Sequence, residues 1–163
     1  MRRAASALIA AGLAAALSSP AGAFVSLRSS NAPAGADETV TFVVEHGCAD
    51  SPTVRVRIRM PEGVSGVKPL APPGWKVSAA YASASDDAPV SEVVWLCGKL
   101  APETAGEFAI AMRLPDASGT TLYFPVTQDC ERGSIRWAET PREGVLRGSL
   151  RFPAPALTLS KRR

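Results

Sequence analysis

The sequence predicts an all-β protein, an immunoglobulin-like β-sandwich that follows a cleaved signal peptide. Three observations support this prediction. Short segments alternate apolar and polar residues, glycine and proline separate these segments at spacings of about 8–12 residues, and no helical period appears after residue 23. No repeat or linker divides residues 24–160, so we expect one domain there, followed by a basic tail at 161–163.

The clearest of these segments is Val54–Met60. Its apolar residues are Val54, Val56, Ile58 and Met60, and its intervening residues are Arg55, Arg57 and Arg59. Because successive side chains of a strand point to opposite faces, this segment predicts a central strand with an apolar inner face and a guanidinium outer face. Pro61-Glu62-Gly63 ends the strand, and the prolines that follow keep the chain extended as far as Trp75.

The remaining strands are expected around this one. Their predicted ranges are Phe24–Leu27, Thr39–Glu45, Trp75–Tyr81, Val90–Leu96, Glu107–Leu114, Thr121–Gln128 and Gly133–Trp137. We expect loops at 31–37 and 46–52, where turn-forming residues gather. The tryptophans at 75, 95 and 137 and the methionines at 60 and 112 are expected in or near the core.

Residues 1–23 have the composition of a signal peptide. Arg2 and Arg3 precede an apolar run, and Ala21-Gly22-Ala23 is a small-residue cleavage site. The apolar run is shorter than the roughly 20 residues that a membrane-spanning helix needs. We therefore expect cleavage after Ala23, a mature chain that begins at Phe24 without a transmembrane segment, and a periplasmic or secreted location.

The charge of the mature chain is close to neutral. The full sequence has 18 basic and 15 acidic residues, and removing Arg2 and Arg3 leaves 16 against 15, a net charge of +1. Interspersed signs of this kind give no electrostatic footprint for nucleic acid. We expect the tail at 161–163 to be a frayed terminus.

The single histidine, His46, excludes most familiar catalytic arrangements. No nucleophile-elbow motif is present, and a histidine-rich zinc site is impossible, so we do not expect an enzyme. His46 precedes Gly47 at the end of a predicted strand, and we interpret it first as a residue of the turn.

Cys48, Cys97 and Cys130 predict one disulfide and one remaining thiol in an exported protein. Three pairings are open, although Cys48 and Cys130 both lie in loops beside strands. Cys97 follows Trp95-Leu96 and is expected to fill a gap in the core as a buried thiol. A three-thiolate metal site is the alternative, but no spacing resembles CxxC.

Several phrases along the chain resemble the YcnI-like copper-binding family of exported bacterial proteins. They are His46-Gly47-Cys48, Val54-Arg55-Val56-Arg57-Ile58, Pro61-Glu62-Gly63-Val64, Pro73-Gly74-Trp75, Val93-Val94-Trp95, Gly98, Leu100, Glu107-Phe108, Gly119-Thr120-Thr121-Leu122-Tyr123-Phe124-Pro125-Val126, Gln128, Cys130-Glu131 and Trp137. The resemblance covers almost the whole mature chain. It implies a β-sandwich in a copper-handling context, with copper transport proteins as partners, and it supports Cys48–Cys130 as the disulfide.

The resemblance also implies a Cu(II) site at the mature N-terminus. In the family, an N-terminal histidine binds copper through its α-amine and imidazole, together with a carboxylate and a tryptophan. The tryptophan matches Trp137, and the carboxylate is placed at Glu38. Nitrogen donors in a tetragonal plane are those that Cu(II) prefers.

This chain departs from the family at that site. Phe24 stands where the histidine is expected, so only its α-amine remains, and the third mature residue is Ser26 rather than histidine. His46 could substitute if its loop folds back to the N-terminus. Cys97 stands where relatives have a small residue, and it is a second candidate ligand, for Cu(I).

Two functions follow from these observations. The first is an exported copper-binding or copper-homeostasis domain whose site is weakened or relocated. The second is a metal-free β-sandwich that acts as an interaction module of the periplasm. Phe24 favours the second for mechanism, whereas the resemblance along the chain favours the first for biological context.

Overall fold

The computed structural model describes residues 24–85 and 87–162. The predicted signal peptide lies outside these residues. The described strands are β1 Val25–Leu27, β2 Asn31–Pro33, β3 Asp37–Val44, β4 Thr53–Arg59, β5 Ser65–Pro69, β6 Lys76–Tyr81, β7 Val90–Leu96, β8 Gly106–Arg113, β9 Thr121–Tyr123, β10 Val126–Cys130, β11 Ser134–Trp137 and β12 Ala156–Ser160, with one 3₁₀ helix, η1, at Arg147–Ser149. No helix among them is long and apolar enough to span a membrane.

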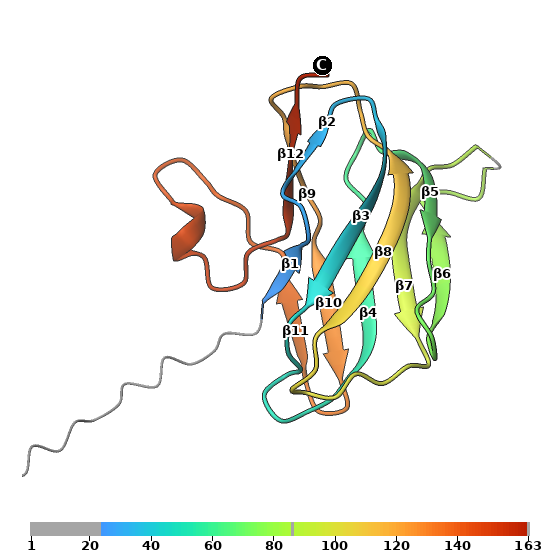
Figure 1. Cartoon of the computed structure of the whole chain (residues 1–163), viewed down its shortest axis with the longest axis vertical. Coiled ribbons are helices and arrows are strands. Elements are labelled where there is room, and N and C mark those ends of the chain that lie inside the picture. Colours follow the sequence, from blue (N-terminus) through green and yellow to red (C-terminus); the bar gives the residue numbers. More distant parts are fainter. Residues whose placement is uncertain (1–23, 86, 163) are drawn as a thin grey trace, which may run out of the picture.

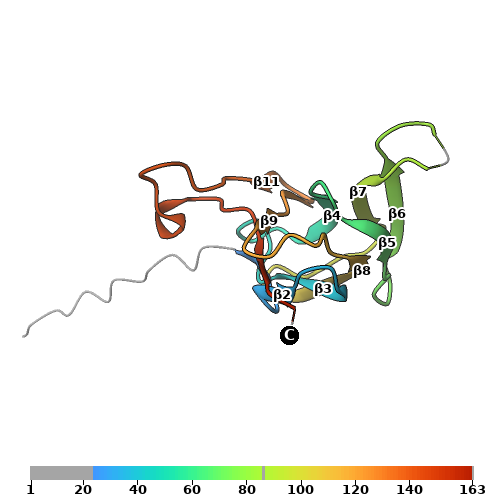
Figure 2. The same ribbon diagram turned by 90° about the horizontal axis from the view of Figure 1, so that it is seen from above.

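The strands form two main sheets and one small sheet. The four-stranded sheet has the order β1-β3-β8-β5, and the five-stranded sheet has the order β11-β10-β4-β7-β6. Figure 2 shows these sheets as two layers, and Figure 1 shows the small β2-β12-β9 sheet toward one end of them. All pairings are antiparallel except β2 with β12. The prediction of an all-β sandwich is confirmed.

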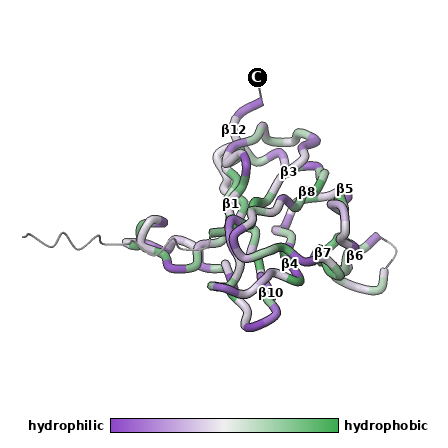
Figure 3. The backbone as a smooth tube through the Cα atoms, turned by 60° about the horizontal axis from the view of Figure 1, so that its bottom comes forward, coloured by the Kyte–Doolittle hydropathy of each residue, from purple (hydrophilic) through white to green (hydrophobic). Residues whose placement is uncertain are grey.

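The core between the layers is built from aromatic and branched side chains. Phe108 from β8 packs edge-on against Trp95, with 5.4 Å between ring centroids, and Phe42 packs similarly against Phe124 at 5.3 Å. The indole N–H of Trp95 donates to the carbonyl oxygen of Leu70 at 2.8 Å. Such edge-to-face pairs and satisfied indole donors are what a well-packed aromatic core needs. Figure 3 shows that the hydrophilic turn after β10 lies away from this core.

The strand predicted at 54–60 is β4, the middle strand of the five-stranded sheet. Val56 and Ile58 are fully buried and Arg55 and Arg59 are exposed, as the alternation predicts. Arg57 is half-buried, and Thr53 is buried before the predicted start. The strand predicted at 90–96 coincides with β7.

The strand predicted at 121–128 is divided into β9 and β10. β9 pairs with β12 in the small sheet, whereas β10 pairs with β4 and β11 in the five-stranded sheet. Pro125 lies between them and its carbonyl accepts from the Arg59 N–H at 2.9 Å. Because proline has no N–H to donate, a continuous ladder through this position would lose a bond. The chain changes sheets here.

Three strands were not predicted. β2 falls in the predicted loop at 31–37, β5 falls in the segment expected to be merely extended, and β12 ends the described chain. β12 carries the usual signal, because Leu157 and Leu159 are buried while Thr158 and Ser160 are exposed.

A close approach in the turn after β7 fixes the position of Trp75. A Cβ atom added to Gly98 would overlap the indole ring of Trp75, which packs on Phe108 at 5.0 Å. Glycine is therefore required here for space, because any side chain would displace the indole.

We expect Gly98→Ala to lower the free energy of unfolding by about 1–3 kcal/mol, the usual cost of inserting a methyl group into a packed site. Urea denaturation followed by tryptophan fluorescence measures this change. The control is Gly148→Ala, because a Cβ at Gly148 meets nothing within 4 Å. Equal stability of the two variants would contradict the close packing of Trp75.

Candidate functional site

The first described residue lies beside the end of β3. β1 pairs with β3 so that Val25 is opposite Val44, and the Glu45 N–H donates to the Phe24 carbonyl at 3.1 Å. The Glu45 carboxylate accepts from the Ser26 hydroxyl at 3.3 Å. His46, the next residue, is therefore brought to Phe24 by the antiparallel pairing of β1 and β3.

Trp137 reaches the same place from β11. Its ring centroid lies 6.0 Å from that of Phe24 and 5.5 Å from that of Phe152. The indole is almost fully buried, and its N–H donates to Gln128 Oε1 at 3.2 Å. We call the group Phe24, Glu45, His46, Gln128 and Trp137 the β1 corner.

The amide of Gln128 joins the parts of this corner. Gln128 is fully buried on β10, and its Nε2 donates to the His46 carbonyl at 2.7 Å and to Thr53 Oγ1 at 2.8 Å. Together with the Trp137 N–H, these bonds satisfy both ends of the amide, which a buried polar group requires. A glutamine at an inward position of a predicted strand is the sequence signal for this role, and Gln128 was singled out only within the resemblance.

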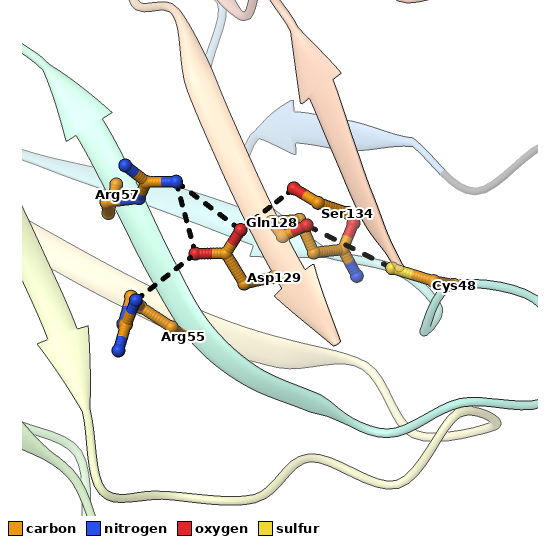
Figure 4. A network of polar contacts seen from close by, with 6 residues as sticks. All are labelled: Cys48, Arg55, Arg57, Gln128, Asp129 and Ser134. Atoms are coloured by element: carbon orange, nitrogen blue, oxygen red, sulfur yellow. Dashed lines mark hydrogen bonds and ion pairs between the residues drawn. The ribbon is translucent and has the colours of Figure 1, made fainter. Parts of the chain in front are cut away.

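The disulfide joins Cys48 and Cys130, as predicted. Cys130 is on the inward face of β10, two residues after Gln128, so the bond fixes the loop that also carries His46. Figure 4 shows Cys48 close to Gln128, on the opposite side of β10 from Asp129. Because the bond uses two of the three thiols, it removes the three-thiolate alternative.

The expectation that Cys97 is buried is wrong. Cys97 is an exposed cysteine outside the disulfide. β7 ends at Leu96, and Cys97 adopts a positive φ of 63° in the turn that follows, so it leaves the strand alternation on which the expectation depended.

The structure does not bring Glu38 to Phe24. Glu38 lies near the start of β3, paired with Met112 of β8, whereas Phe24 lies at the other end of that strand. Val44 lies six positions after Glu38, a distance of about 20 Å along a strand. The carboxylate that does lie beside Phe24 belongs to Glu45.

The donors at the β1 corner fit a complete amino-terminal Cu(II) chelate poorly. The side chain of Phe24 has no donor, and the corner supplies one imidazole, from His46, and one carboxylate, from Glu45. Within the described residues, no three His, Cys, Asp or Glu side chains are grouped to hold a metal ion. His46 also contributes its carbonyl to the Gln128 bond, in keeping with the turn role predicted for it, and its side chain is exposed.

We expect Gln128→Leu to lower the free energy of unfolding by about 2–4 kcal/mol, because it removes the hydrogen-bond partner of the buried Trp137 N–H and of the buried Thr53 hydroxyl. Chemical denaturation measures the change. Asn31→Leu is the matched control, since it removes an amide that is exposed. A loss in Gln128→Leu no larger than in the control would contradict the bridging role of this amide.

We expect one thiol per folded, unreduced chain to react with a maleimide, because Cys97 is exposed and the other two cysteines are bonded. Peptide mapping should place the label on Cys97, and Cys97→Ser should remove all labelling. Label found on residue 48 or 130 would contradict the disulfide.

The comparisons with known proteins agree with this architecture. The chain aligns with an uncharacterized protein from Nocardia farcinica that has an immunoglobulin-like fold, at 24% identity and a TM-score of 0.69, over 84% of this chain and 98% of that one. An alignment with a family 123 glycoside hydrolase from Clostridium perfringens has 12% identity and a TM-score of only 0.29, and covers 65% of this chain and 21% of that one. No curated protein matches. The first likeness shows an immunoglobulin-like fold, as predicted. Residues 24–159 match the model of a domain of unknown function, DUF1775, and the chain belongs to that family.

Proposed function

We propose that this protein is an exported copper-handling domain, a binding protein rather than an enzyme, with a weak Cu(II) site at the β1 corner. The observation that carries the proposal is the position of Phe24. This residue begins the predicted mature chain, and its ring lies 6.0 Å from that of Trp137, the tryptophan that the YcnI-like resemblance assigns to the copper site.

Three groups would hold the metal. After cleavage at Ala23, the α-amine of Phe24 would lie beside Glu45, whose N–H bonds to the Phe24 carbonyl at 3.1 Å, and His46 follows directly. An amine, an imidazole and a carboxylate supply the nitrogen and oxygen donors that Cu(II) accepts. Glu45 takes the place first assigned to Glu38. Bound copper would supply a Lewis-acidic, redox-active centre.

The site is expected to be weak because the side chain of Phe24 offers no donor. An N-terminal histidine binds through its amine and imidazole within one residue, so the two donors are already close together before the metal binds. Here the imidazole must come from His46, on a different segment of the chain, and its exposed side chain loses conformational freedom on binding.

Two further features support an exported role. The Cys48–Cys130 disulfide is of a kind that persists in oxidising compartments such as the bacterial periplasm. The first 23 residues have the composition of a cleaved signal peptide. Copper transport proteins are the partners that this context suggests.

A metal-free interaction module is the second candidate, and exposed apolar side chains favour it. Phe24 is 48% exposed and Leu146, in the loop that carries η1, is 81% exposed. Figures 1 and 2 show this loop on the same side of the molecule as the start of β1. An apolar surface of this kind is suited to a protein partner.

We expect the mature protein, beginning at an authentic Phe24, to bind Cu(II) at least about tenfold more weakly than its Phe24→His variant, since tenfold is the effect of only 1.4 kcal/mol. Isothermal titration calorimetry measures both affinities. Glu45→Gln and His46→Ala should weaken binding by the unaltered mature chain, whereas the control Glu38→Gln should not.

Equal affinities in the mature protein and in Phe24→His would contradict a site at the terminus. Weakening by Glu38→Gln rather than by Glu45→Gln would contradict the assignment of the carboxylate. If neither protein binds Cu(II), the copper proposal fails and the interaction module remains.

A further inference from the structure

The outer face of the five-stranded sheet carries a concentration of arginines. Thr127 of β10 is paired with Arg57 of β4 on one side and with Arg136 of β11 on the other. Directly paired residues point to the same face, so the two guanidiniums flank the threonine hydroxyl. With about 4.8 Å between neighbouring strands, their backbones are about 10 Å apart. Arg59 lies two residues beyond Arg57 on this face.

Only part of this positive charge is neutralised. Asp129 lies 3.2 Å from a guanidinium nitrogen of Arg57 and 3.8 Å from one of Arg55, and its other oxygen accepts from the Ser134 hydroxyl at 2.8 Å (Figure 4). Within the part of the chain that the structure describes, neither Arg59 nor Arg136 has a carboxylate within 4.0 Å.

These side chains line an open groove of about 380 Å³. Its polar lining is Arg57, Arg59, Glu92, Thr127, Ser134 and Arg136. Guanidinium groups present rigid pairs of N–H donors that match the oxygens of a tetrahedral anion, and the hydroxyls add single donors. Three guanidiniums in one groove are therefore suited to an oxyanion such as phosphate.

Glu92 adds a requirement on the ligand. It is paired with Arg59 across β4 and β7 and lines the same groove, yet no ion pair within 4.0 Å joins the two residues. An ionised carboxylate only accepts hydrogen bonds, so it repels a fully deprotonated anion and accepts a bond from a protonated one. Near neutral pH, inorganic phosphate and many phosphomonoesters retain a proton in part of their population, whereas sulfate and phosphodiesters have none to donate.

We propose that this groove binds a protonated phosphate group, as inorganic phosphate or as a phosphomonoester. Arg59 and Arg136 supply the charge that has no acidic partner, Arg57 is held in place by Asp129, and Glu92 accepts the ligand's proton in a hydrogen bond. The groove is distinct from the β1 corner, so the proposal does not depend on copper binding.

The test is calorimetric titration of the mature protein with inorganic phosphate near neutral pH, at constant ionic strength. Arg59→Gln and Arg136→Gln should each weaken binding by about threefold to fivefold, the size expected for loss of one exposed charge–charge contact. Both side chains are exposed, so neither change should affect folding. The matched control is Arg113→Gln, which removes an arginine paired with Asp37 at 3.1 Å in the other sheet and should leave binding unchanged.

Sulfate and glycerol phosphate separate the parts of the proposal. The unaltered protein should bind sulfate at least about tenfold more weakly than phosphate, and Glu92→Gln should reduce this difference by improving sulfate binding. Binding of glycerol phosphate would extend the ligand class to monoesters, whereas binding of inorganic phosphate alone would restrict it to the free anion.

Three results would overturn the proposal. The first is absence of phosphate binding by the unaltered protein. The second is an equal loss in Arg113→Gln and Arg59→Gln, which would indicate a response to total charge. The third is sulfate binding as tight as phosphate binding, which would exclude the role of Glu92.

Discussion

The buried amide of Gln128 holds together the segments that form the β1 corner. Its three hydrogen bonds connect the His46 loop, β4 and Trp137 of β11 to β10. Two of these bonds, to Thr53 and to Trp137, are buried, and breaking either would leave a polar group without a partner, which costs more than the bond itself contributes. The Cys48–Cys130 bond, two residues further along β10, holds the same loop covalently. The β1 corner is therefore positioned from the interior of the sandwich.

The two faces of β10 have separate roles because side chains alternate along a strand. Gln128 and Cys130 point inward and hold the corner together, while Asp129 between them points outward and holds Arg57. The same alternation holds on β11. Trp137 points inward and packs on Phe24, whereas Arg136 points outward and lines the groove proposed to bind phosphate. Adjacent residues thus belong to different candidate sites, so a single substitution can alter one site and leave the other unchanged.

Sequence patterns were sufficient to predict a strand where the residues of that strand alone showed its position and its faces. β4 was predicted from alternation, which also gave its outward arginines, and β7 was predicted as a short apolar segment between turns. What could not be predicted depends on register between distant segments. Glu38 lies near the start of β3 and Glu45 directly follows its end, and only the pairing of β1 with β3 shows which of these carboxylates lies beside Phe24. The groove likewise depends on β10 lying between β4 and β11, since Arg57 and Arg136 are 79 residues apart in the sequence.

The small electrostatic repulsion between charges in water explains why several arginines can share an exposed face. In water, two unit charges repel by only about 0.4 kcal/mol at about 10 Å and by about 1 kcal/mol at about 4 Å, so exposed arginines can share a face without a carboxylate for each of them. The same screening limits what a single exposed ion pair with a ligand contributes, typically 1 kcal/mol or less. Selective binding on such a face must therefore come from several donors acting on one anion and from a group that penalises the wrong anion. The several donors are the guanidiniums of Arg57, Arg59 and Arg136. The group that penalises the wrong anion is the Glu92 carboxylate, which lines the same groove and has no ion pair of its own.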